Sequence, residues 1–263
     1  ASNSLEIVDR FADRLAILVD LVYDQPSGQP GPAMVLATIF FAFQIYCDFS
    51  GSCDIALGSA QVLGFRLMDN FKRPYFAVSI PEFWWRWHIS LSTWFRDYVY
   101  VPLGGGRVGN IRWYFNIFLV FLISGLWHGA NWTFAAWGAL HGFYYLCSVW
   151  FQPAREGIAK LFGLTGHSRL RTALQILITF HLVAFAGVFF RANSLADALY
   201  IVSHLLDFSS TSSLLKEMMI KTRTETLLGL SKLEILLSMA LIMMLLTVQF
   251  FQKFTRLIEV IAS

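Results

Sequence analysis

Long stretches without charge alternate along the chain with short charged segments. Residues 25–47 carry no charged side chain, and residues 113–154 form a 42-residue window without one. At about 20 residues per crossing, the longer window predicts two membrane-spanning helices. Residues 173–190 and 235–252 are each long enough for one more. Residues 5–23 instead set Leu, Ile and Val at helical spacing among charges, which is typical of an amphipathic or partly inserted helix.

Composition supports a membrane protein. Of 263 residues, 56% are hydrophobic and 14% charged, with a mean hydropathy of +0.56, whereas a soluble domain carries about 25% charged residues. We therefore expect an all-α, polytopic transmembrane protein with one membrane-embedded domain over residues 1–263. The chain begins without Met or a signal peptide, which indicates the C-terminal part of a larger protein.

Charge and cysteine content exclude other classes. The net charge of +3 gives no reason to expect a nucleic-acid partner. Cys47, Cys53 and Cys147 are too few for a disulfide framework, and no Cys-x-x-Cys pair offers a zinc site, so we expect no metal. Because Cys47 and Cys53 have apolar neighbours, we expect both to be buried thiols.

Two basic loops suggest an orientation in the membrane. Residues 66–112 hold seven Lys or Arg against three acids, and residues 155–171 hold four against one. If residues 113–154 cross twice, both loops lie on one side, which the positive-inside rule places in the cytoplasm. Residues 1–24 hold five acids against two Arg, and they can lie outside if residues 33–65 make one broken crossing.

A first polar cluster follows the apolar residues that end near Cys47. Asp48 and Asp54 stand at the predicted end of this helix, where Ser50 and Gly51 permit a break. Polar groups in a membrane segment are costly and are therefore candidates for function. The alternative is helix-end capping, since Asp and Ser side chains satisfy backbone N–H groups there.

A second cluster, residues 81–97, interleaves Trp with Arg, His, Ser and Thr. Glu82 and Arg86 are four residues apart on one helical face, which predicts an ion pair. Arg96 and Asp97 supply another charged pair. The cluster, which also contains His88, fits either a bound anionic or thioester-bearing ligand or an interfacial aromatic belt with basic anchors.

A third cluster surrounds His128 in the longest uncharged window. Gly125 and Gly129 flank it, and such small residues let another segment or a substrate approach closely. A neutral imidazole can act as a general base at physiological pH. The alternative is a hydrogen-bonded core histidine.

Other catalytic motifs are absent from the sequence. It contains no Gly-x-Ser-x-Gly, no phosphate-binding Gly-rich loop and no His-Glu-x-x-His. Any chemistry therefore depends on histidine without an obvious side-chain nucleophile. His141 is a further candidate for such a role, whereas His181 and His204 are expected to be structural.

Several motifs occur together and in order between about residues 36 and 198. They lie at residues 44–58, 64–66, 70–71, 74–75, 82–98, 102–105, 125–131, 138–142 and 189–192. Together they resemble the membrane-bound O-acyltransferase family, most closely its alginate O-acetylase branch and more distantly the teichoic-acid D-alanyl transferases. One departure is local, because Ser52 and Cys53 stand where the alginate enzymes typically have Tyr and Ser.

The resemblance implies a multi-pass protein of the bacterial inner membrane with a tunnel through the bilayer and further helices before this segment. A cytoplasmic thioester donor, acetyl-CoA or an acyl carrier, would supply the acyl group. The acceptor would be a hydroxyl of an exported polysaccharide such as alginate, or of a secreted relay partner. The family histidines fall on His128, the usual catalytic one, and His88.

This chemistry assigns roles to the candidate residues. His128 would take the proton from the acceptor hydroxyl as it attacks the thioester carbonyl, and His88 or a Trp N–H would stabilise the oxyanion. Arg86 and Arg96 suit the phosphates of coenzyme A. The remaining predicted binding residues are Trp87, Asp97, Trp127, Asn131, Asp48 and Ser50. The competing hypotheses are a non-catalytic scaffold and a transporter component of a polysaccharide modification or export complex.

Overall fold

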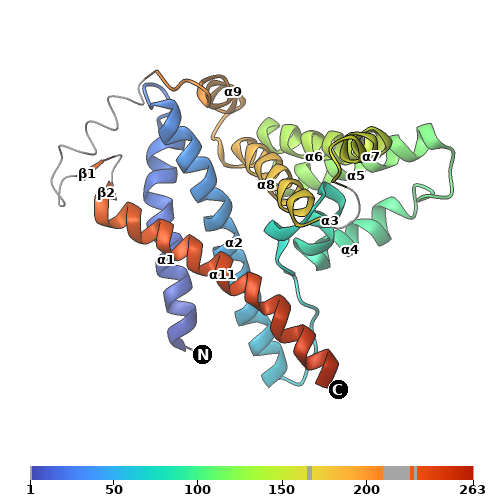
Figure 1. Cartoon of the computed structure of the whole chain (residues 1–263), viewed down its shortest axis with the longest axis horizontal. Coiled ribbons are helices and arrows are strands. Elements are labelled where there is room, and N and C mark those ends of the chain that lie inside the picture. The colour runs from blue at the N-terminus through green and yellow to red at the C-terminus, as the bar shows by residue number, and fades with distance from the viewer. Residues whose placement is uncertain (1, 165–167, 210–225, 228–229, 263) are drawn as a thin grey trace. The chain divides into compact units, whose positions relative to one another are not determined.

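The computed structural model describes residues 2–164, 168–209, 226–227 and 230–262, and nearly all of its regular structure is helical (Figure 1). The longer helices are α1 (Ser2–Asp24), α2 (Gly31–Val62), α5 (Asn110–His128), α6 (Trp132–Trp150), α8 (Arg169–Arg191) and α11 (Lys232–Ala262). Shorter helices are η1 (Pro74–Phe76), α3 (Ile80–Arg86), α4 (Ile89–Phe95), the π-helix η2 (Arg96–Tyr100), α7 (Gln152–Leu161) and α9 (Leu195–His204). Two short antiparallel strands, β1 (Thr226–Leu227) and β2 (Leu230–Ser231), pair Thr226 with Ser231. The all-helical fold class is confirmed.

Within the described part of the chain, four helices are long and apolar enough to cross a membrane. They are α2, α5, α8 and residues Leu233–Phe251 of α11. Four of the predicted segments thus form helices of membrane-spanning length and composition, including the first in residues 113–154. The second helix of that window, α6, is also uncharged, but its Trp, Tyr and His residues lower its hydropathy. Its crossing stays a prediction.

The chain packs as two compact units, one of residues 1–51 with 200–263 and one of residues 52–199. A single domain over the whole chain therefore stays a prediction. In the first unit, α1 has the predicted amphipathic character, with Leu15 and Leu18 fully buried on one face. The Tyr23 hydroxyl lies 3.0 Å from Thr38 Oγ1 of α2.

Helix α2 corrects the prediction for the first polar cluster. The helix runs without a break from Gly31 to Val62, so Asp48 and Ser50 lie in its interior and the helix-end capping interpretation is wrong. Ser50 Oγ instead donates to the Cys47 carbonyl oxygen, 3.3 Å away in the preceding turn. The helix continues because Ser and Gly alone do not end a helix held by apolar neighbours. Cys47 is buried as predicted, but Cys53 is partly exposed.

In the second unit, α5 and α6 form an antiparallel hairpin with very close backbones. A Cβ added to Gly125 would lie 2.3 Å from the Phe134 carbonyl oxygen, and one added to Gly138 would lie 2.4 Å from that of Phe121. At the other end, the rings of Tyr114 and Trp150 are 5.3 Å apart. The hairpin thus brings residues 112 and 155 to one end and His128 to the other.

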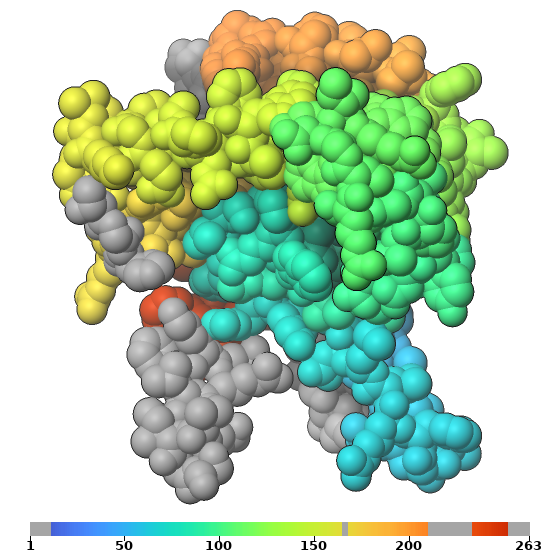
Figure 2. Space-filling model, turned by 90° about the vertical axis from the view of Figure 1, so that its right-hand side faces the viewer, coloured from blue at the N-terminus to red at the C-terminus, as the bar shows by residue number. Residues whose placement is uncertain are grey.

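The basic segment before the hairpin is largely helical over residues 74–100, in keeping with the helical spacing of Glu82 and Arg86. These residues fold into η1, α3, α4 and η2, and bury Tyr75, Phe83 and Phe95. Figure 2 shows the teal residues of α3 and α4 beside the green hairpin. The aromatic content of this segment makes a packed layer instead of an exposed basic loop.

Candidate functional site

His128 is the last residue of α5 and lies among aromatic rings. Its ring centroid is 5.2 Å from that of Trp137 on α6 and 5.1 Å from that of Phe190 on α8. Gly129 follows, and a Cβ at this position would lie 2.7 Å from the ring of Phe134. The small neighbours of His128 therefore allow the close approach of another segment, as the sequence predicts. Three helices of one unit position this imidazole.

His88 lies between α3 and α4, where the chain adopts a left-handed conformation with φ 44° and ψ 57°. Burial, and to a lesser extent a charge on His128, lower the pKa of His88 to about 4. The two imidazoles therefore influence each other electrostatically, although they are 40 residues apart in sequence. At neutral pH, His88 is an uncharged imidazole.

Trp87 and His141 belong to the packing around these histidines. The Trp87 ring stacks on Phe83 at 5.6 Å. His141 is only 1% exposed, and its ring lies 4.9 Å from that of Trp137, which also contacts His128. Its Nδ1 has no hydrogen-bond partner among the described residues. His141 thus lies in the core, with almost no surface for a substrate.

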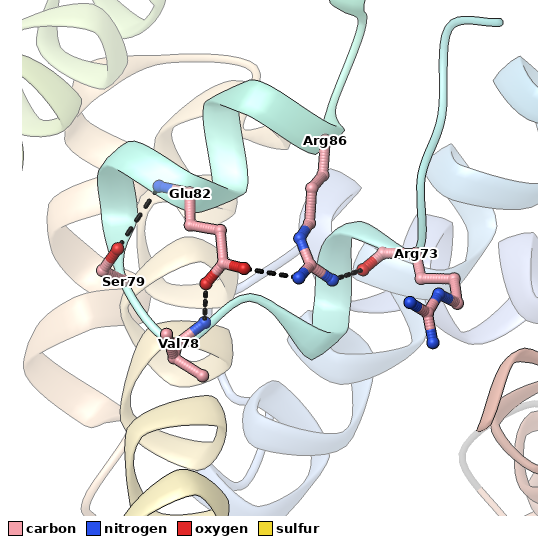
Figure 3. A network of polar contacts seen from close by, with 5 residues as sticks. All are labelled: Arg73, Val78, Ser79, Glu82 and Arg86. Carbon is pink, nitrogen blue, oxygen red and sulfur yellow. Dashed lines mark hydrogen bonds and ion pairs between the residues drawn. The ribbon is translucent and has the colours of Figure 1, made fainter. Parts of the chain in front are cut away.

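Arg86 forms the predicted ion pair with Glu82, and the pair extends into a network (Figure 3). The guanidinium also donates to the Arg73 carbonyl oxygen at 3.3 Å, and the Val78 N–H donates to the second Glu82 oxygen at 2.8 Å. Ser79 caps α3 by accepting from the Glu82 N–H at 3.3 Å. Because Arg86 is engaged with the chain itself, the geometry supports a role in holding α3 against η1. Binding of a donor phosphate by Arg86 stays a prediction.

Arg96 and Asp97 also pair as predicted, with Nε 2.7 Å from Oδ1. Both side chains are exposed, and the hydrogen bond from Arg96 lowers the pKa of Asp97. Arg96 lies at a mainly apolar cavity of about 310 Å³, whose wall also includes Trp84, Ser92 and Ser124. Neither His88 nor His128 lines this cavity. A ligand there would contact Arg96 without touching either imidazole.

Asn131 and Trp127 flank the site. Asn131 caps α6, since its Oδ1 accepts from the Thr133 N–H at 3.2 Å while its Nδ2 donates to the Asn193 carbonyl at 3.3 Å. Trp127 is 56% exposed, and its ring lies 6.5 Å from Phe95. Both therefore border the end of α5 that carries His128.

Other predicted residues lie elsewhere. Asp48 and Ser50 belong to the other compact unit. His181 is exposed, and its Nδ1 lies 2.8 Å from the Leu177 carbonyl of its own helix, as a structural histidine would. His204 similarly has Nδ1 2.9 Å from the Tyr200 carbonyl. Within the ranges that the structure describes, no three His, Cys, Asp or Glu side chains are arranged to hold a metal ion.

Sequence reasoning did not single out Trp137 and Phe190, which surround His128. A signal existed for each, because Trp137 precedes the motif at residues 138–142 and Phe190 lies inside the one at residues 189–192. Spacing alone could not find them, since these rings reach His128 only when three separate helices pack together.

The fold and site define a helical membrane protein with one histidine, His128, held among aromatic rings of three helices and a second, His88, in a left-handed turn of the same unit. The sequence model of the membrane-bound O-acyltransferase family matches residues 11–192, and the chain belongs to this family. The resemblance stated from the motifs is thereby confirmed.

Several bacterial proteins are similar to the chain. "Probable alginate O-acetylase AlgI" of Pseudomonas fluorescens is 42% identical over 76% of this chain and 38% of its own length. A "Peptidoglycan O-acetyltransferase" of Helicobacter pylori is 38% identical over 76% of this chain and 37% of its own length. A "Teichoic acid D-alanyltransferase" of Bacillus subtilis is 31% identical over 57% and 39%. The chain thus spans less than two fifths of these relatives.

Proposed function

We propose that this chain carries the catalytic histidines of a bacterial inner-membrane O-acyltransferase. It moves an acyl group, which we propose is acetyl, from a cytoplasmic thioester onto a hydroxyl. The acceptor is an exported polysaccharide or a secreted relay partner. Family membership and the names of the relatives support the reaction class. The observation that carries the proposal is the position of His128, which lies at the end of α5 among rings from α6 and α8 inside the family match.

The proposed reaction needs only groups that these residues offer. The acceptor hydroxyl oxygen forms a bond to the thioester carbonyl carbon while His128 removes its proton. The carbon–sulfur bond then breaks, and the thiolate leaves with the proton that His128 returns. An uncharged His88 retains one N–H, which can donate a hydrogen bond to the oxyanion of the intermediate. The aromatic rings around His128 limit the entry of water.

The test is acyl transfer by the full-length protein in proteoliposomes, with radiolabelled acetyl-CoA or an acetylated carrier as donor. His128→Ala should abolish transfer while expression and membrane insertion stay near the wild-type level. His181→Ala is the matched control, because this exposed histidine contacts the Leu177 carbonyl and the Phe180 ring of its own helix, and it should retain full activity.

The same experiment separates the competing hypotheses. Retained turnover in His128→Ala removes this residue from the mechanism. A scaffold would transfer no acyl group in the wild-type form either, and a transporter would show substrate flux that survives His128→Ala.

A further inference from the structure

His88 occupies a backbone conformation that needs support from its surroundings. Its φ of 44° lies in the left-handed region, which only a few per cent of non-glycine residues adopt, although His, Asn and Asp do so more often than the others. Such a conformation persists only where neighbouring structure holds it. The contacts on either side of His88 therefore bear directly on where its imidazole points.

Residues 70–72 supply these contacts. On one side of His88, the Lys72 N–H donates to the Arg86 carbonyl oxygen at 2.9 Å; on the other, the Ile89 N–H donates to that of Asn70 at 3.1 Å. Both ends of the left-handed turn are thus attached to one short segment. The backbone around His88 cannot relax without breaking these bonds.

The Asn70 side chain adds a second connection. His88 is the N-cap residue of α4, yet its side chain makes no capping hydrogen bond. Asn70 Oδ1 takes that place, accepting from the Ser90 N–H at 3.0 Å and from Ser90 Oγ at 2.6 Å. An acceptor at this position satisfies an N–H that the first turn of a helix leaves unpaired. The imidazole of His88 therefore does not serve as the cap.

The other end of the Asn70 amide is also fixed. Its Nδ2 lies 3.5 Å from Cys53 Sγ, which accepts a weak hydrogen bond. With Nδ2 directed at Cys53, Oδ1 is directed at Ser90, so the orientation of the amide is defined from both sides.

We propose that Asn70 is a positioning residue for His88: it caps α4 from outside the helix and holds the left-handed turn from which the imidazole projects. This inference rests on the proposed function for its kinetic consequence. Asn70 does not touch the reacting atoms and acts only through His88.

The experiment uses the full-length protein in proteoliposomes and compares Asn70→Ala with Asn70→Asp. Asn70→Ala removes the acceptor and should lower kcat by about 10-fold or more, with the donor KM changed by less than about 2-fold, because a displaced group impairs turnover more than binding. Asn70→Asp keeps an acceptor and should recover activity to within about 3-fold of wild type. Ser168→Ala, which removes the matched cap of α8, should stay within about 2-fold of wild type.

A double-mutant cycle distinguishes positioning from a general structural role. In a His88→Ala background, Asn70→Ala should cause no further loss of kcat, because its effect passes through the imidazole. The same loss in both backgrounds, or full activity of Asn70→Ala, overturns the proposal.

A readout that does not depend on activity is the rate at which diethyl pyrocarbonate modifies His88, followed by mass spectrometry. Asn70→Ala should change this rate at least about 3-fold relative to Ser168→Ala; an unchanged rate overturns the proposal. If the wild-type protein transfers no acyl group, the proposed function fails, while this rate still decides the role of Asn70. Should Asn70→Ala not reach the membrane, Ser90→Ala removes one of the two donors and should give a smaller change in the same direction.

Discussion

Replacing Gly125 by Ala tests whether the α5–α6 hairpin fixes the position of His128. The added Cβ would lie 2.3 Å from the Phe134 carbonyl oxygen and 3.1 Å from the Gly138 Cα. Both neighbours are backbone atoms of α6, which cannot rotate away as a side chain can. The two helices must therefore separate.

The structure sets the size of this effect. Restoring an ordinary contact of 3.4 Å from 2.3 Å requires a displacement of about 1.1 Å, and overpacking of this kind costs about 1–3 kcal/mol of unfolding free energy. Because His128 lies one turn beyond Gly125 and contacts Trp137 on α6, the displacement also moves it from its partner groups. A misplacement of about 1 Å can lower turnover by about 100-fold.

Gly157→Ala is the matched control, since Gly157 lies within α7 and nothing is within 4 Å of the added Cβ. Removing a glycine from an open helical position should stabilise the protein by about 0.4–1 kcal/mol. Thermal unfolding in detergent and acyl transfer in proteoliposomes measure both variants. If Gly125→Ala is as stable and active as Gly157→Ala, the close-packing argument is refuted.

Three further predictions follow from individual residues. His88→Ala should lower transfer partially; if it is as inactive as His128→Ala, the two histidines act as one unit, and full activity would favour the aromatic-belt interpretation. The pKa of His88 is about 4, against 6.5 in an unfolded chain. Its contribution to stability is therefore present above pH 6.5 and is lost as the pH falls toward 4. His88→Gln should flatten the dependence of the unfolding free energy on pH over that interval. A single cysteine at the exposed Arg107, with the three native cysteines replaced, should resist membrane-impermeant reagents in intact cells; labelling there would place this segment outside and refute the cytoplasmic assignment.

Charge-free windows located the long helices because lipid and core packing both exclude charge. The start of α5, the whole of α8 and the apolar span Leu233–Phe251 of α11 follow the predicted windows to within a few residues. The pairing of Glu82 with Arg86 also followed from spacing, because residues four apart on a helix are neighbours.

Other features depend on contacts that no local pattern encodes. Helix α2 continues past Asp48 and Ser50, since Ser and Gly permit a break without requiring one. The attachment of Asn70 to Ser90 joins residues 20 positions apart, and it forms only when the segment before η1 packs against the first turn of α4. The same holds for Phe190, which reaches His128 from α8 across 62 residues of sequence.

The π-helical turn η2 has a consequence for how this segment can change in evolution. The Val101 N–H donates to the Arg96 carbonyl and the Gly105 N–H to that of Tyr100, each across five residues at 2.9 Å. Loss of one residue would convert this turn to an α-helix and rotate the following side chains by about 100°. Tyr100, whose hydroxyl accepts from Trp113 Nε1 at 2.8 Å, would then face away from α5. Relatives should therefore vary in sequence here far more readily than in length. A gap in an alignment at residues 96–105 would indicate a chain in which this turn packs against α5 through different contacts.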